Sequence, residues 1–170
     1  MTATEEQFRQ TKTFIFDIDG VLTDGGVSLL ASGERYRTVF IRDTYAIEQA
    51  LKGGFRVAII SAANADGLRS WLTSMNVKDI FMGGPSDQKV NAFLGYIARD
   101  GLNESEILYM GDDMPDLPIL SRSAILSTCP ADAVDEVQAV CRYISPKVGG
   151  RGAVRDVIEQ VMKAQGKWGL

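Results

Sequence analysis

Residues 13–24 read Thr-Phe-Ile-Phe-Asp-Ile-Asp-Gly-Val-Leu-Thr-Asp. The first four of these residues form a short apolar run, which is typical of a strand buried on both faces of a parallel sheet. Two aspartates, Asp17 and Asp19, follow the run directly. Burying these carboxylates is costly unless a cation compensates their charge. The stretch therefore predicts a buried strand that carries carboxylates to a site at its carboxyl end.

Similar apolar runs recur along the chain, with amphipathic stretches of helix length between them. The runs cover residues 57–60, 80–82, 107–110, 124–126 and 142–144. The predicted helices cover residues 44–52, 66–75, 89–100, 116–121, 131–140 and 152–164. Because strands and helices alternate, the sequence predicts an α/β fold: a doubly wound, Rossmann-like parallel sheet with helices on both faces. The length predicts a single domain over residues 1–170.

Residues 26–41 interrupt this alternation. Apolar and polar residues alternate there on either side of a turn that contains Gly33, which predicts a β-hairpin. Because the hairpin follows the first strand, we expect it to project from the edge of the sheet where active sites form. Two of its residues, Arg35 and Arg37, are expected to face solvent or to contact another subunit.

The composition excludes several classes of protein and of site. The chain has no histidine, which rules out Ser-His-Asp and Cys-His pairs and histidine-ligated zinc or iron. Its formal net charge of -4 argues against a nucleic-acid-binding domain. Cys129 and Cys141 are too few for a zinc site, and free thiols are favoured over one disulfide, as in a reducing cytoplasm. Residues 1–12 lack the apolar core of a signal peptide, and no apolar run approaches the ~20 residues of a membrane span. We therefore expect a cytoplasmic protein.

Chemically suggestive residues follow the predicted strands in a fixed order. They are Asp17 and Asp19, then Ser61, then Lys89 at the start of a helix, then Asp112, Asp113 and Asp116. Carboxyl ends of neighbouring parallel strands meet at one edge of a sheet, so the two acidic groups converge if the first and fourth strands are neighbours. Carboxylates without His or Cys favour Mg²⁺. Together with a hydroxyl and a lysine they suit a phosphoryl group. Each motif alone is a common turn or cap, but the ordered set is specific.

The ordered set resembles the haloacid dehalogenase superfamily of phosphatases. The resemblance covers residues 17–116 and rests on D-x-D-G-V-L-T-D, a Ser, a Lys and G-D-D-x-x-D. It implies that Asp17 is the nucleophile and Asp19 the general acid and base. It also implies that Ser61 binds phosphoryl oxygens and that Lys89 neutralises the charge of the nucleophile and the phosphoryl group.

The same resemblance implies a bound Mg²⁺ ion. Its ligands would be the side chain of Asp17, the backbone carbonyl of Asp19 and the side chain of Asp112. Asp113 and Asp116 would support that site.

The likeness extends to the capless branch that contains the 3-deoxy-D-manno-octulosonate 8-phosphate phosphatases. It rests on the hairpin, the Arg42-Asp43 pair, the short chain and the tail, residues 149–170. It implies a single domain without a cap and a phosphorylated 2-keto-3-deoxy sugar acid as substrate. It also implies a homotetramer, in which the hairpin and the tail of a neighbour cover the site.

Four residues are expected to contact the sugar acid, namely Arg42, Asp43, Arg151 and Arg155. The glycine-rich loop at residues 149–152 precedes a predicted helix, and its N–H groups and the helix N-terminus would suit an anion.

The sequence departs from the family at two places near the expected sugar. Ser61-Ala62-Ala63 stands where many members have Thr-Gly-Arg, and Thr44 stands where the family has Gly. Ser61 keeps the hydroxyl, but a cationic side chain is lost at Ala63. These departures leave a nine-carbon, sialic-acid-like phosphate as an alternative substrate.

Two alternatives from other classes are disfavoured. A phosphoaspartate receiver domain carries its hydroxyl and Lys after the acidic residues, whereas here Ser61 and Lys89 precede Asp112. A catalytically idle binding protein does not need Asp17, Asp19, Lys89 and Asp112 together.

Overall fold

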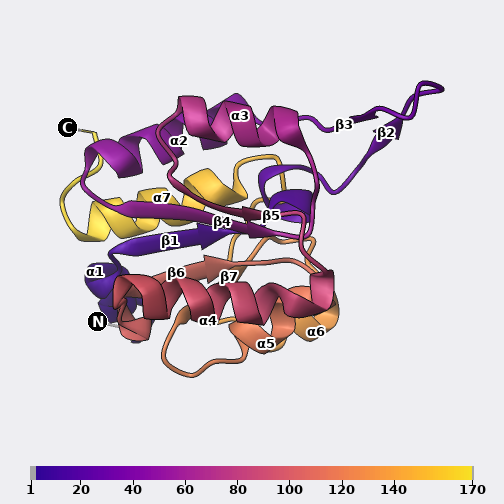
Figure 1. The fold of residues 1–170 in the computed structure, drawn as a ribbon. Helices are drawn as coiled ribbons and strands as arrows, with labels where there is room; N and C mark the ends of the chain where they lie inside the picture. Colours follow the sequence, from indigo (N-terminus) through magenta and orange to yellow (C-terminus); the bar gives the residue numbers. More distant parts are fainter. Residues whose placement is uncertain (1–2, 170) are drawn as a thin grey trace.

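A six-stranded parallel sheet forms the centre of the computed structural model, which describes residues 3–169. The strands lie in the order β5-β4-β1-β6-β7-β8, and every neighbouring pair is parallel (Figure 1). They are β1 (Thr13–Phe16), β4 (Arg56–Ser61), β5 (Asp79–Met82), β6 (Ile107–Met110), β7 (Leu126–Cys129) and β8 (Tyr143–Ile144). The chain builds one half outward from β1 and then returns to place β6 on its other side, so β1 lies at the switch point where ligands of such sheets bind. The predicted doubly wound α/β fold is confirmed.

Helices cover both faces of this sheet. They are α1 (Ala3–Gln10), α2 (Ile41–Lys52), α3 (Asp66–Ser74), α4 (Lys89–Asp100), α5 (Leu117–Leu120), α6 (Asp135–Gln138) and α7 (Ala153–Ala164), with short 3-10 turns at Ser86–Gln88, Glu104–Glu106 and Met114–Asp116. Helices α2, α3 and α7 lie on one face, and α4, α5 and α6 lie on the other (Figure 1). None of the described helices is long and apolar enough to cross a membrane.

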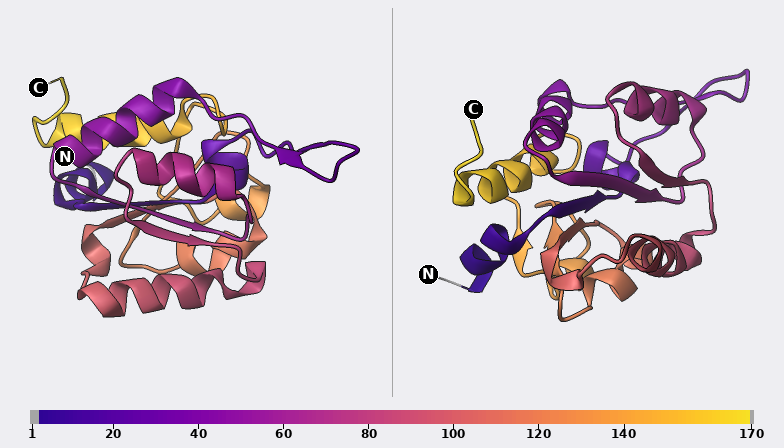
Figure 2. Two further views of the ribbon diagram at one scale, coloured as in Figure 1. Left: turned by 45° about the horizontal axis from the view of Figure 1, so that its top comes forward. Right: turned by 60° about the vertical axis from the view of Figure 1, so that its left-hand side comes forward.

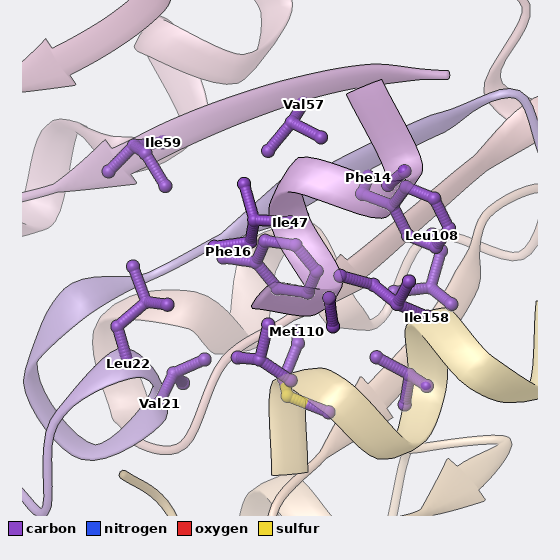
Figure 3. Packing of buried hydrophobic residues seen from close by; sticks show 14 of the residues in the cluster. Phe14, Phe16, Val21, Leu22, Ile47, Val57, Ile59, Leu108, Met110 and Ile158 are labelled. Atoms are coloured by element: carbon purple, nitrogen blue, oxygen red, sulfur yellow. The ribbon is translucent and has the colours of Figure 1, made fainter. Parts of the chain in front are cut away.

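Strand β1 is packed on both faces because its side chains alternate. Phe14 and Phe16 belong to the core under α2 and α7, whereas Ile15 belongs to the core under α4 and α5. Figure 3 shows the two phenylalanines in one packed cluster with Ile47 of α2 and Ile158 of α7. All of these side chains are fully buried, which fixes the position at which β1 ends.

The hairpin predicted for residues 26–41 is present and projects away from the body of the molecule (Figures 1 and 2). Its ladder is short: β2 (Ser28–Leu29) pairs with β3 (Arg35–Tyr36), and Gly33 has φ 86° in the turn. Leu29 and Tyr36 are 74% and 55% exposed. The described part of the chain contains no cap domain.

Several predicted boundaries were wrong. Helix α2 begins at Ile41 rather than at residue 44, because Phe40 accepts the N–H groups of the following turn. Residues 131–134 form a turn rather than part of a helix, since the amide of Ala131 donates to Lys147 and α6 begins only after Val134. Helix α1 was not predicted at all; it is eight residues long and is anchored by Phe8, which packs edge-on against Tyr143.

Candidate active site

Asp17 and Asp19 stand on a distorted turn that follows β1. Asp17 accepts the N–H of Ile18 through Oδ1 at 2.6 Å, and the π-helical turn Ile18–Leu22 is kinked at Asp19 and Gly20. Gly20 has φ 80°, and a Cβ at this position would lie 1.9 Å from Oδ2 of Asp112. Only glycine therefore lets the loop after β1 approach the loop after β6 this closely.

Lys89, the first residue of α4, forms a buried ion-pair network with two aspartates. Its Nζ donates to Oδ2 of Asp17 at 2.6 Å and to Oδ1 of Asp116 at 2.9 Å. The side chains of Lys89, Asp17 and Asp116 are 6%, 6% and 0% exposed. Asp116 is fixed in turn by the hydroxyl of Tyr109 at 2.6 Å and by the amide of Asp112 at 3.3 Å. The network thus aims Lys89 at Asp17.

Three carboxylates converge beside this lysine. Oxygens of Asp17, Asp112 and Asp116 all lie within 4.8 Å of one another. Burial, followed by the charge of Asp116, raises the pKa of Asp17 to about 6, although Lys89 opposes the shift. Burial and the charges of Asp17 and Asp116 raise the pKa of Asp112 to about 7. One lysine does not balance three carboxylates, so the donor set fits a hard divalent cation such as Mg²⁺. The backbone carbonyl of Asp19, predicted as a further ligand, stays a prediction.

Ser61 completes this side of the site. It is the last residue of β4 and is buried, and its Oγ accepts the amide of Ala63 at 3.2 Å. A cavity of about 250 Å³ opens between the strand ends. Residues that line it include Asp17, Asp19, Ser61, Lys89, Asp112 and Asp113. The structure therefore brings these sequence-predicted residues together, with Asp116 buried directly behind them.

The expectation for Arg37 was wrong. It was expected to face solvent or another subunit, but its side chain is only 7% exposed and binds Asp19. Nε donates to Oδ1 of Asp19 at 2.6 Å, and Nη2 donates to Oδ2 at 2.9 Å. Arg37 directly follows β3, and Arg35 within that strand is exposed. Nothing in the sequence indicates that the side chain of Arg37 turns toward Asp19, so the pair could be found only in three dimensions.

The arginines expected to contact the sugar lie elsewhere in the structure. Arg42, Arg151 and Arg155 line a separate cavity of about 390 Å³, together with Lys147. None of the residues that line this cavity also lines the cavity around Asp17. Their predicted substrate contacts therefore stay predictions, and the fold of the single chain does not bring them to the aspartates.

Asp43 has an internal role in the fold. It is 1% exposed, and its two carboxylate oxygens accept the amides of Gly152 at 3.2 Å and Arg155 at 2.8 Å. It therefore caps the N-terminus of α7, where the glycine-rich loop was expected to receive an outside anion. The amides of Gly149 and Gly150 are likewise engaged, by Asp132 and Val21.

Comparison with known proteins identifies the family. No family model matches the chain. The 3-deoxy-D-manno-octulosonate 8-phosphate phosphatase KdsC of Escherichia coli is 31% identical over 156 residues, which cover 92% of this chain and 81% of the relative. The chain belongs to the 3-deoxy-D-manno-octulosonate 8-phosphate phosphatase family. It is accordingly a phosphoric monoester hydrolase, and the receiver-domain alternative falls.

Solved structures of other members agree with this assignment. The enzyme of Moraxella catarrhalis, solved with magnesium, phosphate and KDO, superimposes with a TM-score of 0.91 at 29% identity, covering 98% of this chain and 94% of the other. The enzyme of Haemophilus influenzae, solved with cobalt, gives a TM-score of 0.87 at 30% identity and covers 95% and 92%. The family fold therefore extends over nearly the whole chain.

Proposed function

We propose that this family member hydrolyses the phosphomonoester of 3-deoxy-D-manno-octulosonate 8-phosphate, with Mg²⁺ and through an aspartyl phosphate on Asp17. The observation that carries the proposal is the buried pairing of Asp17 with Lys89, at a cavity also lined by Ser61 and Asp112. The lysine favours the ionised form of the nucleophilic carboxylate against the effect of burial, and it offers positive charge to the incoming phosphoryl group.

The reaction proceeds in two displacements. An oxygen of Asp17 attacks phosphorus, the ester P–O bond breaks, and Asp19 gives a proton to the leaving alkoxide. Asp19 then takes a proton from water, which attacks phosphorus and releases inorganic phosphate from Asp17. Ser61 donates its hydroxyl to a phosphoryl oxygen.

The metal-binding residues we propose are Asp17 and Asp112 through their side chains and Asp19 through its backbone carbonyl, with Asp113 and Asp116 in support. Bound Mg²⁺ would supply positive charge to the phosphoryl oxygens. The magnesium in the Moraxella catarrhalis enzyme and the cobalt in the Haemophilus influenzae enzyme support a divalent cation here.

We also propose that the protein works as a homotetramer. The exposed Leu29 and Tyr36 on the projecting hairpin support a neighbour against this arm, since apolar side chains gathered on a thin projection favour burial. A neighbour is also the means by which Arg42, Arg151 and Arg155 would reach an active site.

A phosphate-release assay tests the substrate. Eight-carbon and nine-carbon sugar acid phosphates are compared by kcat/KM, with Mg²⁺ and with a chelator. We expect the eight-carbon substrate to be preferred and the chelator to abolish turnover. Preference for a nine-carbon substrate would favour the alternative that Ala63 raises, whereas turnover unaffected by chelation would contradict the metal.

The Asp17→Asn variant tests the mechanism. We expect turnover to fall by at least about a thousandfold, because an amide is not a nucleophile here, while the fold is retained. Asp113→Asn, on an exposed neighbour in the same cavity, is the matched control and should lose less. Near-normal phosphate release by Asp17→Asn would contradict the assignment of Asp17 as the nucleophile.

A further inference from the structure

We propose that Arg37 receives the carboxylate of the substrate and that it holds Asp19 away from the ester oxygen until that carboxylate arrives. This inference rests on the proposed function, because it assigns the second anionic group of the sugar acid to a place beside the same site. It makes Arg37 a specificity-determining residue on the hairpin.

The first support is the geometry of the Arg37–Asp19 pair. Each oxygen of Asp19 accepts one guanidinium N–H, at 2.6 Å and 2.9 Å. Such a bidentate pair is strong and directional. It turns the carboxylate of Asp19 toward the hairpin, with both oxygens engaged. For Asp19 to act on the ester oxygen, this pair has to loosen.

The second support is an unused donor on the same guanidinium. Nη1 of Arg37 is buried and has no hydrogen-bond partner among the described residues. A buried N–H without an acceptor is costly, so it points to an acceptor that comes from outside the chain. Asp19 occupies the edge formed by Nε and Nη2, which leaves the edge formed by Nη1 and Nη2 for a second carboxylate.

The third support is location. Arg37 lines a cavity of about 820 Å³ between the hairpin and the start of α3, with Arg35 and Asn64 among the other lining residues. Asp19 lines the smaller cavity around Asp17. The Arg37–Asp19 pair therefore connects the two cavities, so a substrate with its phosphate at Asp17 can extend its chain past Arg37.

The fourth support is that, among the described residues of this chain, no other cation lining these two cavities is both buried and free to bind a carboxylate. Of the cations that line these two cavities, Lys89 is held between Asp17 and Asp116, and Arg35 is exposed on the hairpin. Ala62 and Ala63, which follow Ser61, carry no charged side chain. Arg37 is thus the buried guanidinium on the path of the substrate.

These observations combine into a simple sequence of contacts. The carboxylate of the substrate binds the free edge of Arg37 and shares its positive charge with Asp19. The hold on Asp19 weakens, and Asp19 turns toward the ester oxygen. A phosphate ester without a carboxylate leaves Asp19 bound to Arg37 and is turned over poorly.

The test compares two substrates across matched variants. Wild type, Arg37→Ala, Arg37→Lys and the hairpin control Arg35→Ala are assayed with Mg²⁺ on 3-deoxy-D-manno-octulosonate 8-phosphate and on p-nitrophenyl phosphate. In Arg37→Ala we expect kcat/KM for the sugar acid phosphate to fall about 10- to 100-fold, as for loss of a charged hydrogen-bonded contact. Its kcat for p-nitrophenyl phosphate should rise, because Asp19 is released. Arg37→Lys should recover part of the loss, and Arg35→Ala should keep the wild-type ratio.

An unchanged ratio of kcat/KM between the two substrates in Arg37→Ala, as equal losses on both would give, would overturn the proposal. Calorimetric titration of 3-deoxy-D-manno-octulosonate provides a readout that is independent of turnover. Weaker binding of this sugar acid to Arg37→Lys and Arg37→Ala than to Arg35→Ala is expected, and equal binding would refute the contact. Failure of the wild type to release phosphate from either substrate would count against the proposed function instead, and the titration would still decide the role of Arg37.

Discussion

At the scale of single residues, Lys89 is the cation on which the acidic cluster depends. It bridges Asp17 and Asp116 in a pocket where all three side chains are buried. Replacing it with Met leaves buried carboxylates without a counter-charge. We expect Lys89→Met to lower the free energy of unfolding by about 3–5 kcal/mol at neutral pH, measured by urea denaturation. Lys163→Met, which removes an exposed cation from α7, is the control; an equal and small effect of both would contradict the role of Lys89.

The same carboxylates predict a pH dependence of stability. The pKa values of Asp17 and Asp112 are raised in the folded state, from 3.8 to about 6 and to about 7. A carboxyl group of this kind binds its proton more tightly when folded, so its stabilising effect is full below the unfolded pKa and is lost as the pH rises through the folded pKa. We expect the metal-free protein to lose stability between about pH 4 and about pH 7.

Mg²⁺ should remove most of this loss near neutral pH, since it compensates the ionised carboxylates. Urea denaturation at several pH values, with Mg²⁺ and with a chelator, measures the difference. In Asp112→Asn the difference should shrink. Superimposable curves with and without the metal would show that the cluster does not bind it.

The meeting of the candidate residues at one edge of the sheet was predictable from the sequence, whereas their catalytic roles stay predictions. Asp17 directly follows β1, Ser61 ends β4 and Lys89 begins α4, so their meeting at one edge follows from the topology of a parallel sheet. The expectation for Arg37 was wrong, because the environment of this side chain depends on how the hairpin is oriented relative to the turn after β1. No local pattern in the sequence carries that information.

At the scale of elements, Asp43 joins two helices. It lies in the first turn of α2 and accepts two amides at the start of α7. Burial raises its pKa to about 6, although both amides oppose the shift. Asp43→Ala leaves these amides without an acceptor, and we expect a loss of about 1–2 kcal/mol in the free energy of unfolding, typical of a lost helix cap. Asp43→Asn keeps an acceptor and should lose less, whereas a larger loss for Asn than for Ala would contradict the capping role.

The order and type of the elements were predictable because apolar runs and amphipathic stretches differ in period. The residues at which the elements begin and end were less predictable. The start of α2 depends on hydrogen bonds to the backbone carbonyl of Phe40. The helix predicted from residue 131 starts later, at α6, because the amide of Ala131 donates to the carbonyl of Lys147. Both are contacts between backbone groups, which side-chain patterns do not encode.

At the scale of the whole molecule, the hairpin is the part most exposed to a neighbour. Leu29 is 74% exposed on an arm that extends from the body (Figure 2). We expect Leu29→Asp to dissociate the proposed tetramer, because burying a leucine is worth about 1.5–3 kcal/mol at each copy of the contact. Size-exclusion chromatography with light scattering measures the mass. Leu94→Asp on α4, 39% exposed, is the control, and a monomeric wild type would refute the tetramer.

The close approach of Gly20 to Asp112 has an evolutionary consequence. A side chain at position 20 would occupy the space of a carboxylate oxygen, and the local φ of 80° disfavours any residue with a Cβ. Mutations in this codon are therefore tolerated only when they are silent, for as long as Asp112 keeps its place. A side chain at position 20 could be accommodated only if Asp112, far along the chain, were also replaced or displaced.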